Sequence, residues 1–155
     1  IRAGDKDQED LLLPVEGITS PGTEDMRRLS SLAYSPEKQL LLYTIQELDS
    51  FTVIAHDLKQ SKELFSQQIS DGESVVMDLS FDGSHQYAAI RYYGDSRQSV
   101  KLYDVQKNAF VKAPFLDTAM NAFWAGEKLL VEKTGAGGTI HWMYDPRTAM
   151  AVIGG

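Results

Sequence analysis

The residues of this sequence that could perform chemistry are three histidines, His56, His85 and His141, and 22 aspartates and glutamates. Histidine can act as a general base or a metal ligand, and paired carboxylates can act as acid and base in hydrolysis. The sequence contains no Gly-x-Ser-x-Gly nucleophile elbow, no His-x-x-x-His metal pair and no cysteine. We therefore expect a non-enzymatic protein with no catalytic residues, no metal site and no cofactor.

Two segments have the outline of an ion-binding loop and each lacks a necessary residue. Four acids within residues 5–16 have the spacing of calcium ligands, but Asp10 stands where a calcium-binding loop requires glycine. Residues 134–139 are rich in glycine but lack the Gly-Lys-Ser/Thr ending of a phosphate-binding loop. We interpret the first segment as a solvated acidic leader and the second as a hairpin tip.

The sequence pattern that would position any functional site is repeated three times along the chain. Each copy contains a turn followed by an apolar run, and the turns are Ser35-Pro36-Glu37-Lys38, Phe81-Asp82-Gly83-Ser84 and Trp124-Ala125-Gly126-Glu127. A later aspartate closes a β-rich run in each copy, at Asp57, Asp104 and Asp145, with spacings of 47 and 41 residues. A period in the forties with about four strands per copy is typical of β-propeller blades.

This pattern predicts an all-β protein of three four-stranded antiparallel blades, in residues 28–71, 72–116 and 117–155. The expected strands are 29–35, 39–46, 50–57 and 63–69 in the first copy, 74–80, 86–93, 98–104 and 109–114 in the second, and 118–124, 128–133, 139–144 and 149–153 in the third. Residues 1–27 are expected to be an acidic, extended leader, in which residues 10–15 could supply an edge strand.

Three blades do not close a ring, because propellers typically have at least four. Three outcomes remain open: a partial propeller cut from a longer one, a six-bladed ring formed by a homodimer, or a β-sandwich or barrel.

The first repeat carries a family resemblance. Residues 35–44 resemble the Ser-Pro-Asp-Gly-Lys phrase, followed by apolar residues and Tyr, of the WD40-like repeats in TolB-type propellers. Residues 79–84 resemble the same phrase with Phe in place of Pro, and the aspartate landmarks resemble the Tyr-Asp that closes the third strand of those blades. The third copy departs from the pattern with Ala-Gly-Glu, and the α/β domain of TolB proteins is missing.

The alignment of the three copies predicts whether each histidine is buried or exposed. His56 stands where the other copies have tyrosine, which predicts a half-buried ring with a polar tip. His141 stands where the other copies have valine, which predicts a buried, hydrogen-bonded imidazole. A functional role of His141 or His56 is the less favoured alternative. His85 follows a turn and is expected to be solvated.

Five aromatic residues are candidates for contact with a protein or peptide, because aromatic anchors on loops at one rim are common in binding surfaces. They are Trp124, Trp142, Tyr92, Tyr93 and Phe115. Trp124 is aligned with Ser35 and Phe81 at a turn. The alternative for each residue is packing in the core.

Charge excludes two classes of partner. The formal net charge is −7 and is concentrated in the acidic leader, so neither nucleic acid nor an anionic membrane surface is an expected partner. No apolar run approaches the ~20 residues that span a bilayer.

The expected function is a propeller-type binding or scaffold module for a protein or peptide. The alternative is a gating or substrate-access segment of a larger hydrolase. The resemblance and the start at Ile1 favour the periplasm, the cell envelope or secretion.

Overall fold

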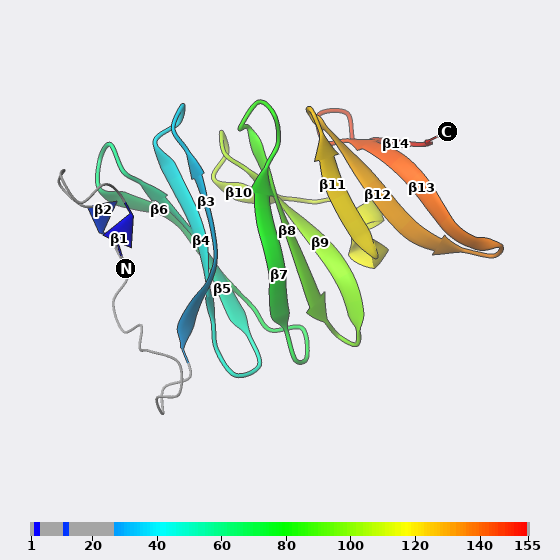
Figure 1. The fold of residues 1–155 in the computed structure, drawn as a ribbon, viewed down its shortest axis with the longest axis horizontal. Helices are drawn as coiled ribbons and strands as arrows, with labels where there is room; N and C mark the ends of the chain where they lie inside the picture. The colour runs from blue at the N-terminus through cyan, green and yellow to red at the C-terminus, as the bar shows by residue number, and fades with distance from the viewer. Residues whose placement is uncertain (1, 4–10, 13–26, 155) are drawn as a thin grey trace.

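Three four-stranded antiparallel sheets follow one another along the chain and lie side by side (Figure 1). The computed structural model describes residues 2–3, 11–12 and 27–154. Sheet 1 contains β3 (Arg28–Ser35), β4 (Leu40–Gln46), β5 (Phe51–Asp57) and β6 (Lys62–Ile69). Sheet 2 contains β7 (Val75–Phe81), β8 (Tyr87–Gly94), β9 (Arg97–Asp104) and β10 (Ala109–Val111). Sheet 3 contains β11 (Asn121–Ala125), β12 (Lys128–Gly135), β13 (Gly138–Asp145) and β14 (Met150–Ile153).

Each of the three sheets is a meander, since strands that are neighbours in sequence are also neighbours in space. This arrangement confirms the predicted fold class of three propeller-type blades, and the three sheets do not join into a barrel. Of the leader, only β1 (Arg2–Ala3) and β2 (Leu11–Leu12) are described, and they pair with each other. The four acids with calcium-like spacing lie outside the described residues.

The expected strands agree with the observed ones within two residues except on either side of one connection. The segment predicted as the strand 109–114 pairs only over Ala109–Val111, and a 3₁₀ helix, η1 (Pro114–Thr118), follows it. Pro114 lacks the backbone N–H that a strand would use and is suited to the first turn of a helix. The helix buries Leu116 completely, so this apolar residue fills the core from the connection between β10 and β11.

The register of the strands identifies on each sheet one row of cross-strand neighbours that is apolar except for Ser80, and we call it the forward row. The forward rows are Ala33–Leu42–Ala55–Phe65 on sheet 1, Ser80–Ala89–Leu102–Val111 on sheet 2 and Phe123–Leu130–Met143–Val152 on sheet 3. In sheets 1 and 2 the two central members of this row are buried, at 0–2% exposure. Because successive side chains of a strand point to opposite faces, these rows are the surfaces on which the next sheet packs.

Two cores fill the spaces between consecutive sheets. Between sheets 1 and 2, Phe51 and Val53 contact Leu79 and Ile90 in one apolar cluster. The second core lies between sheets 2 and 3, where the cluster includes Leu102, Val131 and Tyr144 together with residues of η1. Each fully buried side chain of this size contributes about 1.5–3 kcal/mol relative to an exposed one, so the stack is held chiefly by these two layers.

The outer face of sheet 1 carries a third cluster, formed by Leu41, Tyr43 and Ile45 of β4. These side chains are only 1–2% exposed. Burial raises the pKa of Tyr43 to about 12, and the nearby carboxylate of Glu63 adds to the shift.

The pKa of Tyr43 predicts how the stability of the fold depends on alkaline pH. A tyrosine whose pKa is raised on folding contributes full stability below its ordinary pKa, and this contribution is lost as the pH rises toward the folded-state value. For Tyr43 the free energy of unfolding should fall by about 2–3 kcal/mol between pH 10 and 12, since each unit of pKa shift corresponds to about 1.4 kcal/mol. Denaturant unfolding at several pH values should show a shallower fall in Tyr43→Phe. A Tyr93→Phe control, at an exposed position, should retain the wild-type slope. Equal slopes in wild type and Tyr43→Phe would contradict the prediction.

Candidate functional site

A cleft of ≈ 400 Å³ opens at the rim where the β6–β7 connection, the β8–β9 hairpin and η1 meet. We call it the rim cleft, and its lining residues carry charges of both signs. They are Asp71, Gly72, Tyr92, Gly94, Asp95, Arg97, Ser99, Lys101 and Asp117. Three carboxylates and two cationic side chains therefore share one concave surface.

The floor of the rim cleft is formed by Tyr92 and Ser99, which face each other across β8 and β9 and are 3% and 6% exposed. The hydroxyl of Tyr92 donates a hydrogen bond of 3.1 Å to Oδ2 of Asp71. Burial raises the pKa of Tyr92, and the carboxylates of Asp71 and Asp117 raise it further against a hydrogen bond with Ser99. The Tyr92 hydroxyl consequently stays protonated at neutral pH and serves as a hydrogen-bond donor.

Close backbone packing fixes the wall of the cleft at the β8–β9 hairpin. Asp95 and Ser96 both have left-handed backbone conformations (φ 53° and 61°), as a two-residue hairpin with a primed turn requires. A Cβ added to Gly94 would lie 3.0 Å from both the carbonyl oxygen of Asp71 and Oγ of Ser74, so a larger residue would push the two walls apart. The sequence pattern Gly-Asp-Ser at this turn thus sets the shape of the cleft.

A buried amide holds the opposite wall. Gln46, at 3% exposure, donates from Nε2 to the carbonyl oxygens of Ser50 (2.9 Å) and Ser74 (2.8 Å). Its Oε1 accepts a hydrogen bond of 3.1 Å from the backbone N–H of Val76. One side chain of sheet 1 therefore anchors the start of β7, and with it the connection that carries Asp71.

Most charges in the rim cleft are not neutralised by the protein. Among the described residues, neither the guanidinium of Arg97 nor the carboxylates of Asp95 and Asp117 take part in an ion pair with a side chain. Lys101 lies 6.0 Å from the centre of the Phe110 ring, a weak contact. A bound molecule could therefore form new ion pairs here without breaking existing ones.

The rim cleft continues along an incompletely paired strand. β9 spans Arg97–Asp104, but β10 pairs only with Leu102, Tyr103 and Asp104 of β9. The stretch from Arg97 to Lys101 has no strand beside it on that side in the described part of the chain. A neighbouring groove of ≈ 230 Å³ shares Lys101 and Asp117 with the cleft and extends to Lys112. Both hollows lie beside a strand edge with which no described strand pairs.

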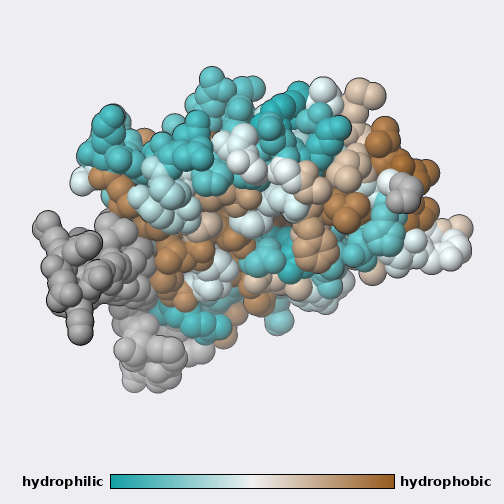
Figure 2. All heavy atoms as spheres, turned by 45° about the horizontal axis from the view of Figure 1, so that its top comes forward, coloured by the Kyte–Doolittle hydropathy of each residue, from teal (hydrophilic) through white to brown (hydrophobic). Residues whose placement is uncertain are grey.

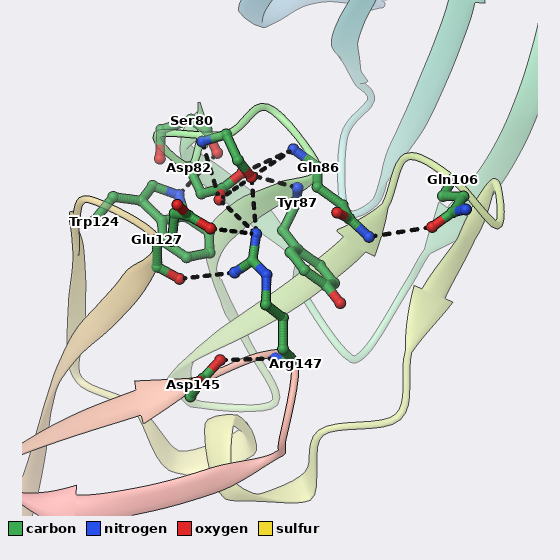
Figure 3. A network of polar contacts seen from close by, with 10 residues as sticks. Ser80, Asp82, Gln86, Tyr87, Gln106, Trp124, Glu127, Asp145 and Arg147 are labelled. Carbon is green, nitrogen blue, oxygen red and sulfur yellow. Dashed lines mark hydrogen bonds and ion pairs between the residues drawn. The ribbon is translucent and has the colours of Figure 1, made fainter.

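A second polar cluster lies at the opposite rim and is centred on a buried carboxylate (Figure 3). The side chain of Asp82 has no exposed surface. It accepts hydrogen bonds from the backbone N–H groups of Gln86 and Tyr87, both at 2.9 Å, and from the hydroxyl of Ser84 at 2.7 Å. These bonds fold the β7–β8 turn around the aspartate, which explains why Asp-Gly-Ser is found at this position.

Arg147, from the β13–β14 turn of sheet 3, reaches this carboxylate (Figure 3). Its Nη2 lies 2.9 Å from Oε1 of Glu127, 2.9 Å from the hydroxyl of Ser84 and 3.6 Å from Oδ2 of Asp82. Its guanidinium also lies 5.3 Å from the centre of the Tyr87 ring. The groups of this Arg147 network bind one another, so the network joins sheet 2 to sheet 3 rather than leaving partners for a ligand.

The structure corrects two of the three histidine predictions. The side chain of His141 is 52% exposed, with Glu132 at 4.0 Å, so the predicted buried imidazole is wrong. Its valine counterparts are buried because another sheet covers them, and no described residue covers this face of sheet 3. His85 is not freely solvated either, since its Nδ1 lies 2.7 Å from the hydroxyl of Ser35 and its ring stacks on Phe81. His56 is partly buried, as predicted. No cluster of three potential metal ligands occurs among the described residues.

The predicted binding aromatics divide into packed and exposed residues. Trp142 and Phe115 contact each other edge to face at 5.4 Å in the core between sheets 2 and 3. Trp124 belongs to the same core and donates from Nε1 to the carbonyl oxygen of Ser80, at 3.1 Å. Tyr92 forms the floor of the rim cleft, and only Tyr93, at 45% exposure, presents its ring to solvent near the rim.

The register also corrects the alignment of Trp124. Trp124 pairs with Leu129 as Tyr34 pairs with Leu41, so Tyr34 rather than Ser35 is its counterpart in sheet 1. The predicted turn position is therefore wrong by one residue, because the turns of the three copies differ in length.

Sequence reasoning missed Asp71, Arg97 and Asp117 as members of one site. They come from the β6–β7 connection, the start of β9 and η1, and they are 26 and 20 residues apart in sequence (97 − 71 and 117 − 97). The one signal was that turn residues such as Asp71-Gly72 and Gly94-Asp95 occur where the blade loops were expected to gather.

No protein-family model matches the sequence, and comparison with curated proteins finds no match either. Similar solved structures include an acylaminoacyl peptidase from Pyrococcus horikoshii, at 12% identity and a TM-score of 0.55 over 81% of this chain and 24% of that one. An acylaminoacyl peptidase bound to Z-Gly-Gly-Phe-chloromethyl ketone matches at 12% identity and a TM-score of 0.53, over 82% and 24% of the two chains. A proposed 6-phosphogluconolactonase from Bacteroides uniformis matches at 11% identity and a TM-score of 0.51, over 98% and 49%.

These likenesses concern the fold alone, because the identities are low. The chain has a propeller-type fold. It spans about a quarter of the length of the two peptidases and about half that of the third protein. The narrower resemblance to TolB-type repeats stays a prediction. Within the described residues, no helix has the length and apolar character needed to cross a membrane.

Removing the Asp82 carboxylate should test the structural role of the Arg147 network. Asp82→Ala leaves the backbone N–H groups of Gln86 and Tyr87 without their acceptor, so we expect the free energy of unfolding to fall by about 2–4 kcal/mol. Asp117→Ala is a matched control, because this carboxylate is exposed and has no hydrogen bond with described residues, and it should change stability by less than about 0.5 kcal/mol. Urea unfolding measures both, and similar losses in the two variants would contradict the assignment.

Proposed function

We propose that this chain is a non-catalytic, propeller-type module that binds an extended segment of a partner protein in the rim cleft. One observation supports the proposal: Arg97, Asp95 and Asp117 of the cleft form no ion pair with other described residues, and they lie beside a strand edge with which no described strand pairs. Charged groups that are not neutralised internally are available to a ligand, and an open edge supplies backbone hydrogen bonds to an added strand.

The open edge explains how an extended peptide would be held. The backbone N–H of Val105 donates to the carbonyl oxygen of Gln86, so every second residue of β9 directs its backbone toward β8. By this alternation Gln98 and Val100 direct their backbone groups away from β8, on the side where β10 has ended. A peptide beside this stretch would gain main-chain hydrogen bonds whatever its sequence.

The charges of the cleft would supply selectivity. Arg97 and Lys101 can pair with acidic side chains of the ligand, and Asp95 and Asp117 can pair with basic ones. The fork of the Arg97 guanidinium is suited to a carboxylate, to which it can form two parallel hydrogen bonds. A segment with alternating charge is therefore the expected ligand.

A random library of 12-residue peptides displayed on phage tests this function. We expect enrichment of charged peptides, and synthetic versions should shift the amide NMR signals of residues that line the rim cleft. Arg97→Glu and Asp117→Lys should each weaken binding at least tenfold, because each places a like charge against the ligand. Lys62→Glu, at an exposed position on sheet 1, is the charge-matched control and should bind normally.

Two results would contradict the proposal. One is that no peptide is enriched above an unrelated propeller used as a blank. The other is that the enriched peptides bind Arg97→Glu and Asp117→Lys as tightly as the wild type while both variants melt normally.

A second candidate function rests on the comparisons. Two of the similar structures are peptidases, and this chain matches about a quarter of each. The chain could accordingly serve as one part of the propeller of a larger hydrolase, with catalysis on a separate domain. In that case the rim cleft would face other parts of the same enzyme, and the library would yield no ligand.

A further inference from the structure

The outer face of sheet 3 is apolar and faces solvent. Its forward row consists of Phe123, Leu130, Met143 and Val152, which pair in register across all four strands. Phe123 and Val152 are 51% and 58% exposed, and Met150 beside them is 64% exposed. Figure 2 shows apolar side chains gathered at this end of the molecule, where β11–β14 lie in Figure 1.

The same row is the packing surface in the other two sheets. Leu42 and Ala89 are the counterparts of Leu130 in register, and both are covered by the next sheet, at 0% and 2% exposure. The forward rows of sheets 1 and 2 are thus the surfaces on which the next sheet packs. Large exposed apolar patches on proteins usually mark such contacts.

We propose that the outer face of sheet 3 binds the same face of a second copy of this chain, which forms a homodimer with a two-fold axis. This inference is independent of the function proposed for the rim cleft. The other face available for a head-to-tail contact is the outer face of sheet 1. Its central residues Leu41, Tyr43 and Ile45 are already buried, at 1–2% exposure, although Leu32 and Tyr34 of β3 on the same face are 44% and 46% exposed. The centre of that face is therefore not available to a partner.

The charges that flank the forward row make the face complementary to itself. On β12, Lys128 and Glu132 lie two residues to either side of Leu130, and they share its face because side chains alternate along a strand. On β13, Asp145 and His141 flank Met143 in the same way. Each of these two strands thus has a negative residue on one side of the row and a basic one on the other.

A two-fold axis along the forward row brings these unlike groups together. It places Leu130 over Leu130 and Met143 over Met143 of the second copy, with the strand directions reversed. Lys128 then faces Glu132 of the other copy, and His141 faces Asp145. Two sheets packed face to face cross at about 30°, so the residues at the centre of the interface, Leu130 and Met143, form the closest contacts.

Single-cysteine variants test the contact directly, because the chain has no cysteine of its own. Under mild oxidation, Leu130→Cys and Met143→Cys should each form a disulfide-linked dimer. Gln67→Cys, at an exposed position on sheet 1, is the control and should cross-link far more slowly. Wild-type protein should also have the mass of a dimer by light scattering at 100 µM.

A charge reversal tests the proposed orientation. Lys128→Glu alone should raise the dimer dissociation constant at least tenfold, because it places two carboxylates opposite each other. Glu132→Lys alone should do the same with two cations. The double variant restores opposite charges and should dimerise within about threefold of the wild type, a rescue that simple loss of folding would not produce.

Three outcomes would overturn the proposal. The first is a wild-type monomer at 100 µM, which would leave a sheet outside the described residues as the occupant of this face. The second is a dimer in which neither Leu130→Cys nor Met143→Cys cross-links. The third is a cross-link that forms only when Met143→Cys is mixed with Tyr34→Cys, which would indicate a head-to-tail ring. A double variant as weak as the single ones would rule out the proposed orientation.

Discussion

The burial of one apolar row between consecutive sheets is the interaction on which the rest of this structure depends. A four-stranded meander cannot bury both faces by itself, so each sheet needs a neighbour on at least one side. Sheet 2 is covered on both faces, and this explains why residues 87–90 of β8 are apolar and fully buried. Sheets 1 and 3 are the ends of the described stack. Each of them has one neighbouring sheet, whereas sheet 2 has two.

Polar contacts set the angle and register of the stack but supply less of its stability. Gln46 joins sheet 1 to the start of β7, and the Arg147 network joins the turns of sheets 2 and 3. Both are located at the rims, where the sheets diverge and water can reach the remaining surface. The rim cleft lies where β10 ends early and the chain crosses to sheet 3 through η1.

The sequence was sufficient to predict the strands and the threefold repeat, because turn residues and apolar runs are local signals. It failed where the outcome depended on what lies outside a repeat. His141 was expected to be buried because its valine counterparts are, yet burial requires a fourth sheet that the described chain does not provide. The end of the strand predicted at residue 114 was wrong because β10 ends at Val111 and Pro114 begins a helical turn.

The rim cleft could not be predicted because its residues come from connections that are distant in sequence. Asp71, Arg97 and Asp117 are ordinary surface residues in their own segments, and only the stacking of sheets 1 to 3 brings them to one surface. The forward row could not be predicted either, because residues 40–43 and 87–90 are apolar at every position and do not alternate. Its exposure on sheet 3 depends on the neighbours of the sheet and not on the strand itself.

The most direct test of this account compares the same substitution at two equivalent positions of the repeat. Leu42 and Leu130 have the same place in register, but only Leu42 is covered by another sheet. In denaturant unfolding at submicromolar concentration, where copies do not associate, Leu42→Ala should lower the free energy of unfolding by about 2–5 kcal/mol and Leu130→Ala by less than about 1 kcal/mol. Equal losses at the two positions would contradict the claim that burial between sheets holds the molecule together.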